Sequence, residues 1–261
     1  MWDSRLASST RDPGAGDGAA LAPLGARAGA AEVFAVAVNL LQHLLEQQVG
    51  AIGEAGSLLA GRMLAGGTVH VFGTGHSRAV AMELAGRAGG LGPMQELVLD
   101  DLVASGIADK SSLLDGSLER RPEAAQALVE GVRTGLDDAF VVISHSGCNG
   151  APVEMALEAR RRHLPVVAIT SMQHSRLVES RHPSGLRLFE VADVCVDTCA
   201  PYADTVLEVA PGVGVCSVSS LAGVAIAQAL TAEVVAHYMR AGRKPPLLVS
   251  RNLSGQARPL H

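Results

Sequence analysis

Aromatic residues, cysteines, basic clusters and long apolar runs are all scarce in this chain of 261 residues. Aromatics make up only 3% of it, whereas 48% is hydrophobic, so its core must be built from aliphatic side chains and alanine. Such interiors suit close packing of helices on a sheet. The length allows one large α/β domain or two small ones.

These absences exclude several classes of protein. The net charge is −5 and no basic patch stands out, which disfavours nucleic-acid binding. No apolar run reaches the ~18 residues of a membrane span. The N-terminus lacks a cationic start followed by an apolar core, so no secretory signal is expected. We therefore expect a cytoplasmic protein without a membrane or nucleic-acid partner.

The four cysteines are too scattered for a metal site. Cys195 and Cys199 are separated by three residues, but a zinc site requires more ligands at close spacing. Reduced thiols are the favoured interpretation. The alternative is that Cys148 is a catalytic cysteine with His145 as its base, although hydroxyl groups dominate the sequence around it. We expect neither a metal nor a cofactor.

The most informative stretch is residues 69–78, V-H-V-F-G-T-G-H-S-R. Its apolar start predicts a buried strand, and the following G-T-G-H-S predicts a turn. A helix is expected from Ser77 to about Ala88. This order brings backbone N–H groups and a helix N-terminus to one point, which is typical of an anion site.

The same pattern occurs again at residues 140–150. A strand F-V-V-I is followed by the turn S-H-S-G-C-N-G and by a helix expected over 152–163. A third strand, 165–170, ends in Thr170 and Ser171. Two such turns predict one phosphate-bearing ligand held from two sides. A dinucleotide fingerprint fails at Arg78, which stands in the third glycine position, and a P-loop requires a lysine that is missing. Purely structural turns are the remaining alternative.

The rest of the chain alternates helices and strands. A helix over 30–49 carries Phe34, Val38, Leu41, Leu45 and Val49 on one face, and a polar loop over 104–121 is long enough to cover a site. We expect further helices at 52–64, 122–135 and 217–239, and further strands at 97–99, 191–197 and 205–209. Residues 1–30 are expected to form a disordered tail.

Continuous apolar strands indicate a sheet covered on both faces. We therefore predict a three-layer α/β/α sandwich with a mainly parallel, doubly wound sheet and extra N-terminal helices. Both turns and the pair Thr170–Ser171 follow strands, so they are expected on one rim of the sheet.

The motifs G-T-G-H-S, S-H-S-G-C-N and A-I-T-S, in this order, resemble the sugar isomerase (SIS) domain of phosphosugar-binding proteins. The stretch S-R-H-P-S-G at 180–185, followed by Leu188 and Ala192–Asp193, resembles the uncharacterised UPF0309 branch. The resemblance covers residues 31–255 as a single domain and leaves 256–261 as a tail.

The resemblance implies a flavodoxin-like fold, a sugar phosphate ligand, and a homodimer or higher homo-oligomer with the site near the subunit interface. By position, the phosphate is bound by Ser144, Ser146 and Asn149, with Gly147 allowing close approach of the backbone. The first turn, with Gly73, Thr74, Gly75 and Ser77, lines the sugar side. Thr170 and Ser171 form a third cluster that completes the rim.

The chain departs from this pattern at two places. His145 stands where this branch often has asparagine. The stretch Pro201-Tyr202-Ala203-Asp204 lacks a glycine expected at the third position.

The chemistry is less defined than the binding. Isomerisation requires a base near C2 and stabilisation of an enediolate, and lyase chemistry requires a base and an acid. The candidates are Glu83, His182 and His76, with Glu154 and Glu233 as further acids. His76 can instead orient a sugar hydroxyl, and a partner subunit can bring His182 to the site.

Two hypotheses of different classes follow. The first is a cofactor-independent isomerase of a hexose or amino-sugar phosphate, or a related lyase or etherase. The second is a non-catalytic phosphosugar sensor. SIS regulators usually carry a DNA-binding domain, and a 30-residue tail is too short for one, which favours a stand-alone enzyme.

Overall fold

The computed structural model describes residues 29–250. Residues 1–28 of the predicted N-terminal tail and all of the predicted tail 256–261 lie outside the described residues. The first helix, α1 (Ala30–Gln47), begins where that N-terminal tail was expected to end.

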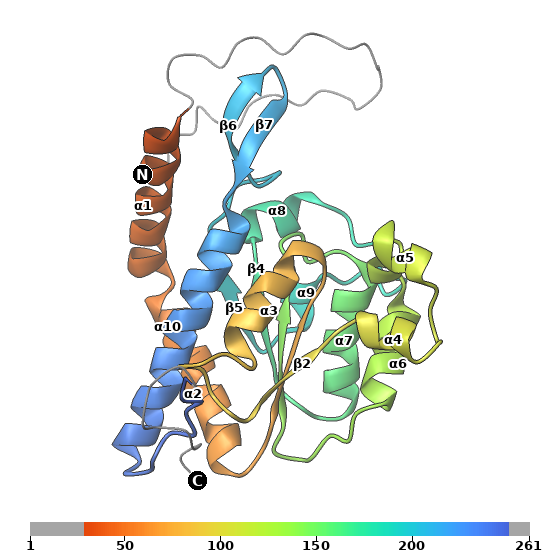
Figure 1. Cartoon of the computed structure of the whole chain (residues 1–261), viewed down its shortest axis with the longest axis vertical. Helices are drawn as coiled ribbons and strands as arrows, with labels where there is room; N and C mark the ends of the chain where they lie inside the picture. Colours follow the sequence, from red (N-terminus) through yellow and green to blue (C-terminus); the bar gives the residue numbers. More distant parts are fainter. Residues whose placement is uncertain (1–28, 251–261) are drawn as a thin grey trace.

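A five-stranded parallel sheet forms the centre of the molecule (Figure 1). Its strands lie in the order β2-β1-β3-β4-β5, which is the flavodoxin-like order. They are β1 (Val69–Gly73), β2 (Met94–Leu97), β3 (Ala139–Ile143), β4 (Val166–Thr170) and β5 (Val194–Asp197). Every residue of β1, β3 and β4 is buried, as their continuous apolar sequences predict. The expected α/β sandwich is confirmed.

Helices cover both faces of the sheet and enclose two separate cores. One face carries α1 and three further helices, which are α2 (Val49–Leu64), α3 (Arg78–Leu84) and α10 (Ser219–Arg240). The opposite face carries α4 (Asp100–Ala104), α6 (Pro122–Glu130), α7 (Gly150–Arg161) and α9 (Leu188–Val191). The short helix α8 (Met172–Leu177) follows β4.

Several predicted elements differ from the structure. The helix expected to run to about Ala88 ends at Leu84, the helix expected over 122–135 ends at Glu130, and the strand expected over 191–197 begins only at Val194. The second strand in the chain, β2, lies at Met94–Leu97 rather than 97–99, because Leu99 already leads into α4. The predicted loop 104–121 contains α5 (Lys110–Leu114) and a 3-10 helix, η3 (Leu118–Arg120).

The strand expected at 205–209 is real but lies outside the central sheet. As β6 (Thr205–Ala210) it pairs, among the described strands, only with β7 (Val213–Ser217), and the two form an antiparallel hairpin that projects from the body (Figure 1). The sequence analysis missed β7, because its residues are mostly exposed and alternate too little in polarity to mark a buried strand.

The hairpin begins at the loop that lacks the expected glycine. Ala203 adopts φ +64° and Asp204 φ +70°, the left-handed region that favours glycine. Asp204 helps to hold this conformation, because its Oδ1 accepts the N–H groups of Val218 (3.0 Å) and Ser219 (2.7 Å) at the start of α10. The loop thus keeps a glycine-like backbone without glycine.

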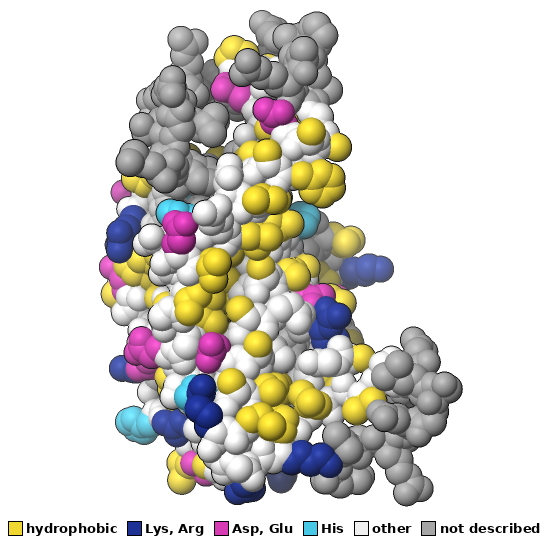
Figure 2. All heavy atoms as spheres, turned by 90° about the vertical axis from the view of Figure 1, so that its left-hand side faces the viewer, with side chains coloured by type: hydrophobic (Ala, Val, Ile, Leu, Met, Phe, Trp, Pro, Cys, Tyr) yellow, Lys and Arg dark blue, Asp and Glu magenta, His cyan; other side chains and the backbone are white. Residues whose placement is uncertain are grey.

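The apolar face predicted for α1 is exposed. Phe34 is 70% and Leu45 68% exposed, whereas Leu40 and Leu44 turn inward to the core. Figure 2 shows hydrophobic side chains gathered along this side of the molecule. We call Phe34, Val38, Leu41 and Leu45 the α1 face. The helix is apolar on two sides, and α10 covers only one of them.

Among residues 29–250, α10 alone is long and apolar enough to cross a membrane by length and composition. Its side chains Ile226, Leu230 and Val234 are buried in the core beside α2. A core helix passes the same test of length and composition, and the buried side chains account for one side of α10.

Candidate functional site

The two glycine- and serine-rich turns begin side by side. Strands β1 and β3 are parallel neighbours, and their last residues, Gly73 and Ile143, are paired. The next strand, β4, continues the same edge, with Ile143 paired to Ile169. The parallel pairing therefore brings the three predicted polar clusters to the same edge of the sheet, at the carboxyl ends of β1, β3 and β4.

The first turn depends on two glycines. A β-carbon on Gly73 would lie 2.6 Å from the backbone oxygen of Ser77, so the chain folds back too tightly for a side chain. Gly75 adopts φ +53° at the start of a 3-10 helix, η2 (Gly75–Ser77). Thr74 and Ser77 are half-buried, and His76 is exposed. The turn thus presents small polar groups and one imidazole.

The second turn closes on itself through Ser144. Its Oγ accepts the N–H of Gly147 (3.2 Å). Gly147 adopts φ +61°, and a β-carbon there would lie 2.8 Å from Ser175 Oγ, so glycine is required both by conformation and by space. Ser146 lies between them and is half-buried.

Helix α7 begins directly after this turn without a side-chain cap. Asn149 is the N-cap residue, but its side chain makes no capping hydrogen bond. Its amide is instead bonded to Glu119 and Arg181. The first-turn N–H groups of α7 therefore face the turn without a side-chain acceptor, and a helix end of this kind attracts an anion.

Thr170 and Ser171, expected on the ligand-facing rim, are fully buried instead. Thr170 Oγ1 donates to the carbonyl oxygen of His145 (3.2 Å), and Ser171 Oγ donates to that of Ala200 (2.7 Å) while accepting the N–H of His174. Both hydroxyls are used within the protein. The Thr170 hydroxyl supports the second turn, whereas the Ser171 hydroxyl joins the segments that follow β4 and β5.

His145, the departure in the second motif, takes part in a ring stack. Its ring lies 4.7 Å from that of His174, which in turn stacks at 4.8 Å on Tyr202. Burial lowers the pKa of both histidines, and that of His174 falls to about 4, with His145 adding to the shift. Both rings are therefore neutral near pH 7.

The predicted catalytic residue Glu83 lies on the α3 side of the sheet. Its carboxylate accepts the side-chain amide of Gln228 on α10 (2.7 Å) and forms an ion pair with Arg87. Glu233, a further candidate, also lies on α10, where its Cβ would be 2.5 Å from a β-carbon on Gly56. Its backbone therefore packs closely against α2.

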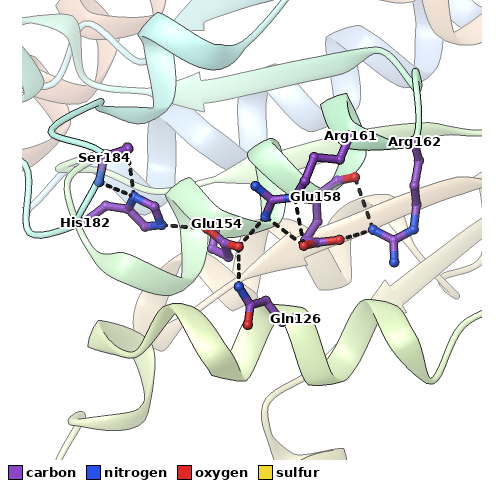
Figure 3. A network of polar contacts seen from close by, with 7 residues as sticks. All are labelled: Gln126, Glu154, Glu158, Arg161, Arg162, His182 and Ser184. Atoms are coloured by element: carbon purple, nitrogen blue, oxygen red, sulfur yellow. Dashed lines mark hydrogen bonds and ion pairs between the residues drawn. The ribbon is translucent and has the colours of Figure 1, made fainter.

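His182 lies beside α7, which covers the opposite face of the sheet from α3 (Figure 3). Its Nε2 is 2.6 Å from Oε2 of Glu154 on α7, and its Nδ1 is 2.8 Å from Ser184 Oγ. Glu154 also accepts from Gln126 on α6 and pairs with Arg161. Both ring nitrogens of His182 are thus occupied. One chain does not bring Glu83, His76 and His182 together.

Family comparisons agree with this geometry. The SIS domain family matches residues 33–171, a span that contains both turns and all of β4. This chain belongs to the SIS domain family.

Its relatives place the SIS protein in the UPF0309 branch. A UPF0309 protein from Caldanaerobacter subterraneus is 34% identical over 219 residues, which cover 82% of this chain and 87% of the relative. Another from Streptomyces coelicolor is 35% identical and covers 87% and 90%, respectively.

Solved structures support the fold of the SIS protein. The phosphoheptose isomerase of Neisseria gonorrhoeae superimposes with a TM-score of 0.53 at 16% identity, covering 79% of this chain and 96% of that one. The phosphoheptose isomerase of Francisella tularensis gives 0.55 at 16% identity, covering 77% and 93%. At this identity the likeness concerns the fold.

The sequence analysis missed Glu119. This residue of η3 reaches into the space between the two turns, where its Oε1 accepts Nδ2 of Asn149 (2.8 Å). A β-carbon on Gly75 would lie 3.6 Å from its Oε2. The available signal was its place in the predicted cover over 104–121, just before a proline that begins a helix.

No group of three or more His, Cys, Asp or Glu residues within 29–250 could hold a metal ion. Burial raises the pKa of the Cys195 thiol to about 11 and that of Cys199 to about 12, with Asp197 adding to both shifts. These two thiols are protonated at neutral pH.

Proposed function

We propose that this SIS protein binds a hexose or amino-sugar phosphate and interconverts its aldose and ketose forms without a cofactor. The uncapped start of α7, beside Ser144 and Ser146, is the observation that carries the proposal, since it offers backbone N–H groups to a phosphate at the carboxyl edge of a parallel sheet. The first turn, Gly73–Ser77, then faces the sugar.

The reaction moves a proton between C1 and C2 through an enediolate. It requires a base within hydrogen-bond reach of C2 and donors for the developing oxyanion. His76 is exposed and belongs to the first turn, which faces the sugar in this proposal. Glu83 and His182 are the other candidates for proton transfer, from opposite layers of the fold.

We also propose a cytoplasmic homodimer with the site near the subunit interface. The α1 face is apolar and exposed, and a second copy of the chain is the occupant that the family resemblance implies. Glu83 lies on α3 in the same helical layer and is hydrogen-bonded to Gln228 of α10. A partner bound to this side would therefore lie near Glu83.

Thermal unfolding with a panel of sugar phosphates tests the binding step. A ligand at about 100 times its dissociation constant should stabilise the protein by about 2.7 kcal/mol. Free sugars and inorganic phosphate are the controls. We expect Ser144→Ala combined with Ser146→Ala to abolish the shift, because the anion site loses both hydroxyls. A folded protein that no sugar phosphate stabilises would refute the proposal.

A non-catalytic sensor is the second candidate, and one observation favours it. Within one chain the three candidate groups do not converge on one point. Incubation with a bound aldose phosphate in D₂O separates the two functions, since an isomerase exchanges the proton on C2 with solvent and a sensor leaves it in place. Loss of exchange in Glu83→Gln or His76→Gln would then identify the base.

A further inference from the structure

We infer that Glu119 selects the sugar part of the ligand, by accepting hydrogen bonds from hydroxyl groups of a sugar phosphate whose phosphate lies at the start of α7. This inference deepens the proposed function and rests on it. Its basis is the position of one carboxylate between the two turns, hydrogen-bonded to Asn149 on one side and facing Gly75 on the other.

The backbone of η3 is fixed against α7 by a close approach. A β-carbon on Gly150, the first residue of α7, would lie 2.2 Å from the carbonyl oxygen of Arg120 and 2.9 Å from Cδ of Pro122. Only glycine allows this contact. It places Glu119, one residue before Arg120, over the start of α7.

The amide of Asn149 then orients the carboxylate. Nδ2 donates to Oε1 of Glu119 (2.8 Å), and Oδ1 accepts from Nη1 of Arg181 (2.6 Å). Because Arg181 can only donate, it fixes which end of the Asn149 amide faces Glu119. Asn149 is buried, so this orientation is held by the fold.

The second carboxylate oxygen remains available. Oε2 of Glu119 makes no hydrogen bond to the residues described, and it faces Gly75, which has no side chain to block it. An ionised carboxylate only accepts hydrogen bonds, so its partner must be a donor such as a hydroxyl group. A phosphate oxygen in this position would be repelled.

The site therefore divides by charge. The α7 start favours an anion, and Glu119 disfavours one while favouring hydroxyl groups. A sugar phosphate satisfies both parts, whereas inorganic phosphate satisfies only the first. The ligand class that fits is a polyhydroxylated carbon chain or ring with a terminal phosphate.

Glu119→Gln tests this division, because glutamine keeps the size of the side chain and an oxygen for Asn149 but removes the charge. We expect calorimetric titration to show a ten- to hundredfold loss of affinity for sugar phosphates, the range of a charge-assisted hydrogen bond. Affinity for inorganic phosphate should stay equal or rise, since a repelling charge is gone. Glu130→Gln, an exposed residue at the far end of α6, is the matched control.

The outcomes separate this inference from the proposed function. If the wild type binds sugar phosphates and Glu119→Gln binds them equally well, Glu119 does not bind the sugar hydroxyl groups, and the proposed phosphate site is unaffected. Equal weakening of sugar phosphate and inorganic phosphate would show that Glu119 only supports the turn, which also overturns the inference. A wild type that binds inorganic phosphate but no sugar phosphate tighter than it overturns both.

Discussion

At the scale of single residues, similar side chains do different work in the two turns. Ser144 closes its turn by accepting a backbone N–H, and the Thr170 hydroxyl braces that turn from within the core, whereas the Ser171 hydroxyl bonds to the Ala200 carbonyl. Asn149 is the N-cap residue of α7, but its side chain is hydrogen-bonded to Glu119 and Arg181. The backbone N–H groups at the start of α7 therefore have no side-chain acceptor. The chemistry of the site thus depends on which hydrogen bonds the protein has already made.

His174 carries a pH dependence at the same scale. Its pKa falls from 6.5 to about 4 because it is buried and lies beside His145. The unfolded chain therefore binds more protons than the folded protein between about pH 6.5 and 4, so stability is full above 6.5 and declines as the pH falls toward 4.

We expect His174→Gln to flatten this decline, because glutamine does not titrate. Urea unfolding at steps from pH 8 to pH 4 measures it, and the difference between the wild type and the variant should be constant above about pH 7. Equal slopes for the two proteins below pH 6.5 would contradict the expectation.

At the scale of elements, the packing of η3 on α7 decides the shape of the site. Of the three residues in this short 3-10 helix, only Leu118 is buried in the core. The contact between the Arg120 carbonyl and Gly150 holds it in place.

Gly150→Ala tests that packing. The new methyl group would clash with the backbone carbonyl of Arg120, so α7 or η3 must shift. We expect a loss of about 1–3 kcal/mol in the free energy of unfolding. Gly53→Ala is the matched control. Gly53 lies inside α2 with open space around it, and alanine there should stabilise by about 0.5–1 kcal/mol. Denaturant unfolding measures both, and a neutral Gly150→Ala would refute the packing argument.

At the scale of the whole molecule, the two helical layers differ in how completely they are covered. The outer surface of the layer with α1 and α10 includes the α1 face, and the β6–β7 hairpin projects at one end of the body (Figure 1). Large apolar side chains in one exposed row along a helix mark a contact surface. A second copy of this chain is the partner we propose.

Phe34→Glu combined with Leu45→Glu tests this surface. We expect the wild type to be a dimer and the variant a monomer of unchanged secondary structure, because both side chains are exposed and contribute little to the core. Light scattering after size-exclusion chromatography gives the mass. Leu136→Glu, at another exposed leucine, is the control and should remain dimeric. A monomeric wild type, or a dimeric double variant, would refute the proposal.

The sequence by itself determined the layers, the parallel sheet and the place of the two turns. Continuous apolar strands followed by G-T-G-H-S and S-H-S-G-C-N carry this information locally, because strand, turn and helix follow one another along the chain. The strand β7 and the boundaries of β2 were not predicted, since their residues lack a clear pattern of burial.

Only the tertiary structure decided which groups meet. Thr170 and Ser171 are turned inward, Glu83 and His182 lie in opposite layers, and Glu119 lies between the turns although it is 44 residues from Gly75 in the chain. Such meetings depend on close approaches between distant segments, such as Gly150 against Arg120. No local periodicity records them, because they arise from the packing of whole elements.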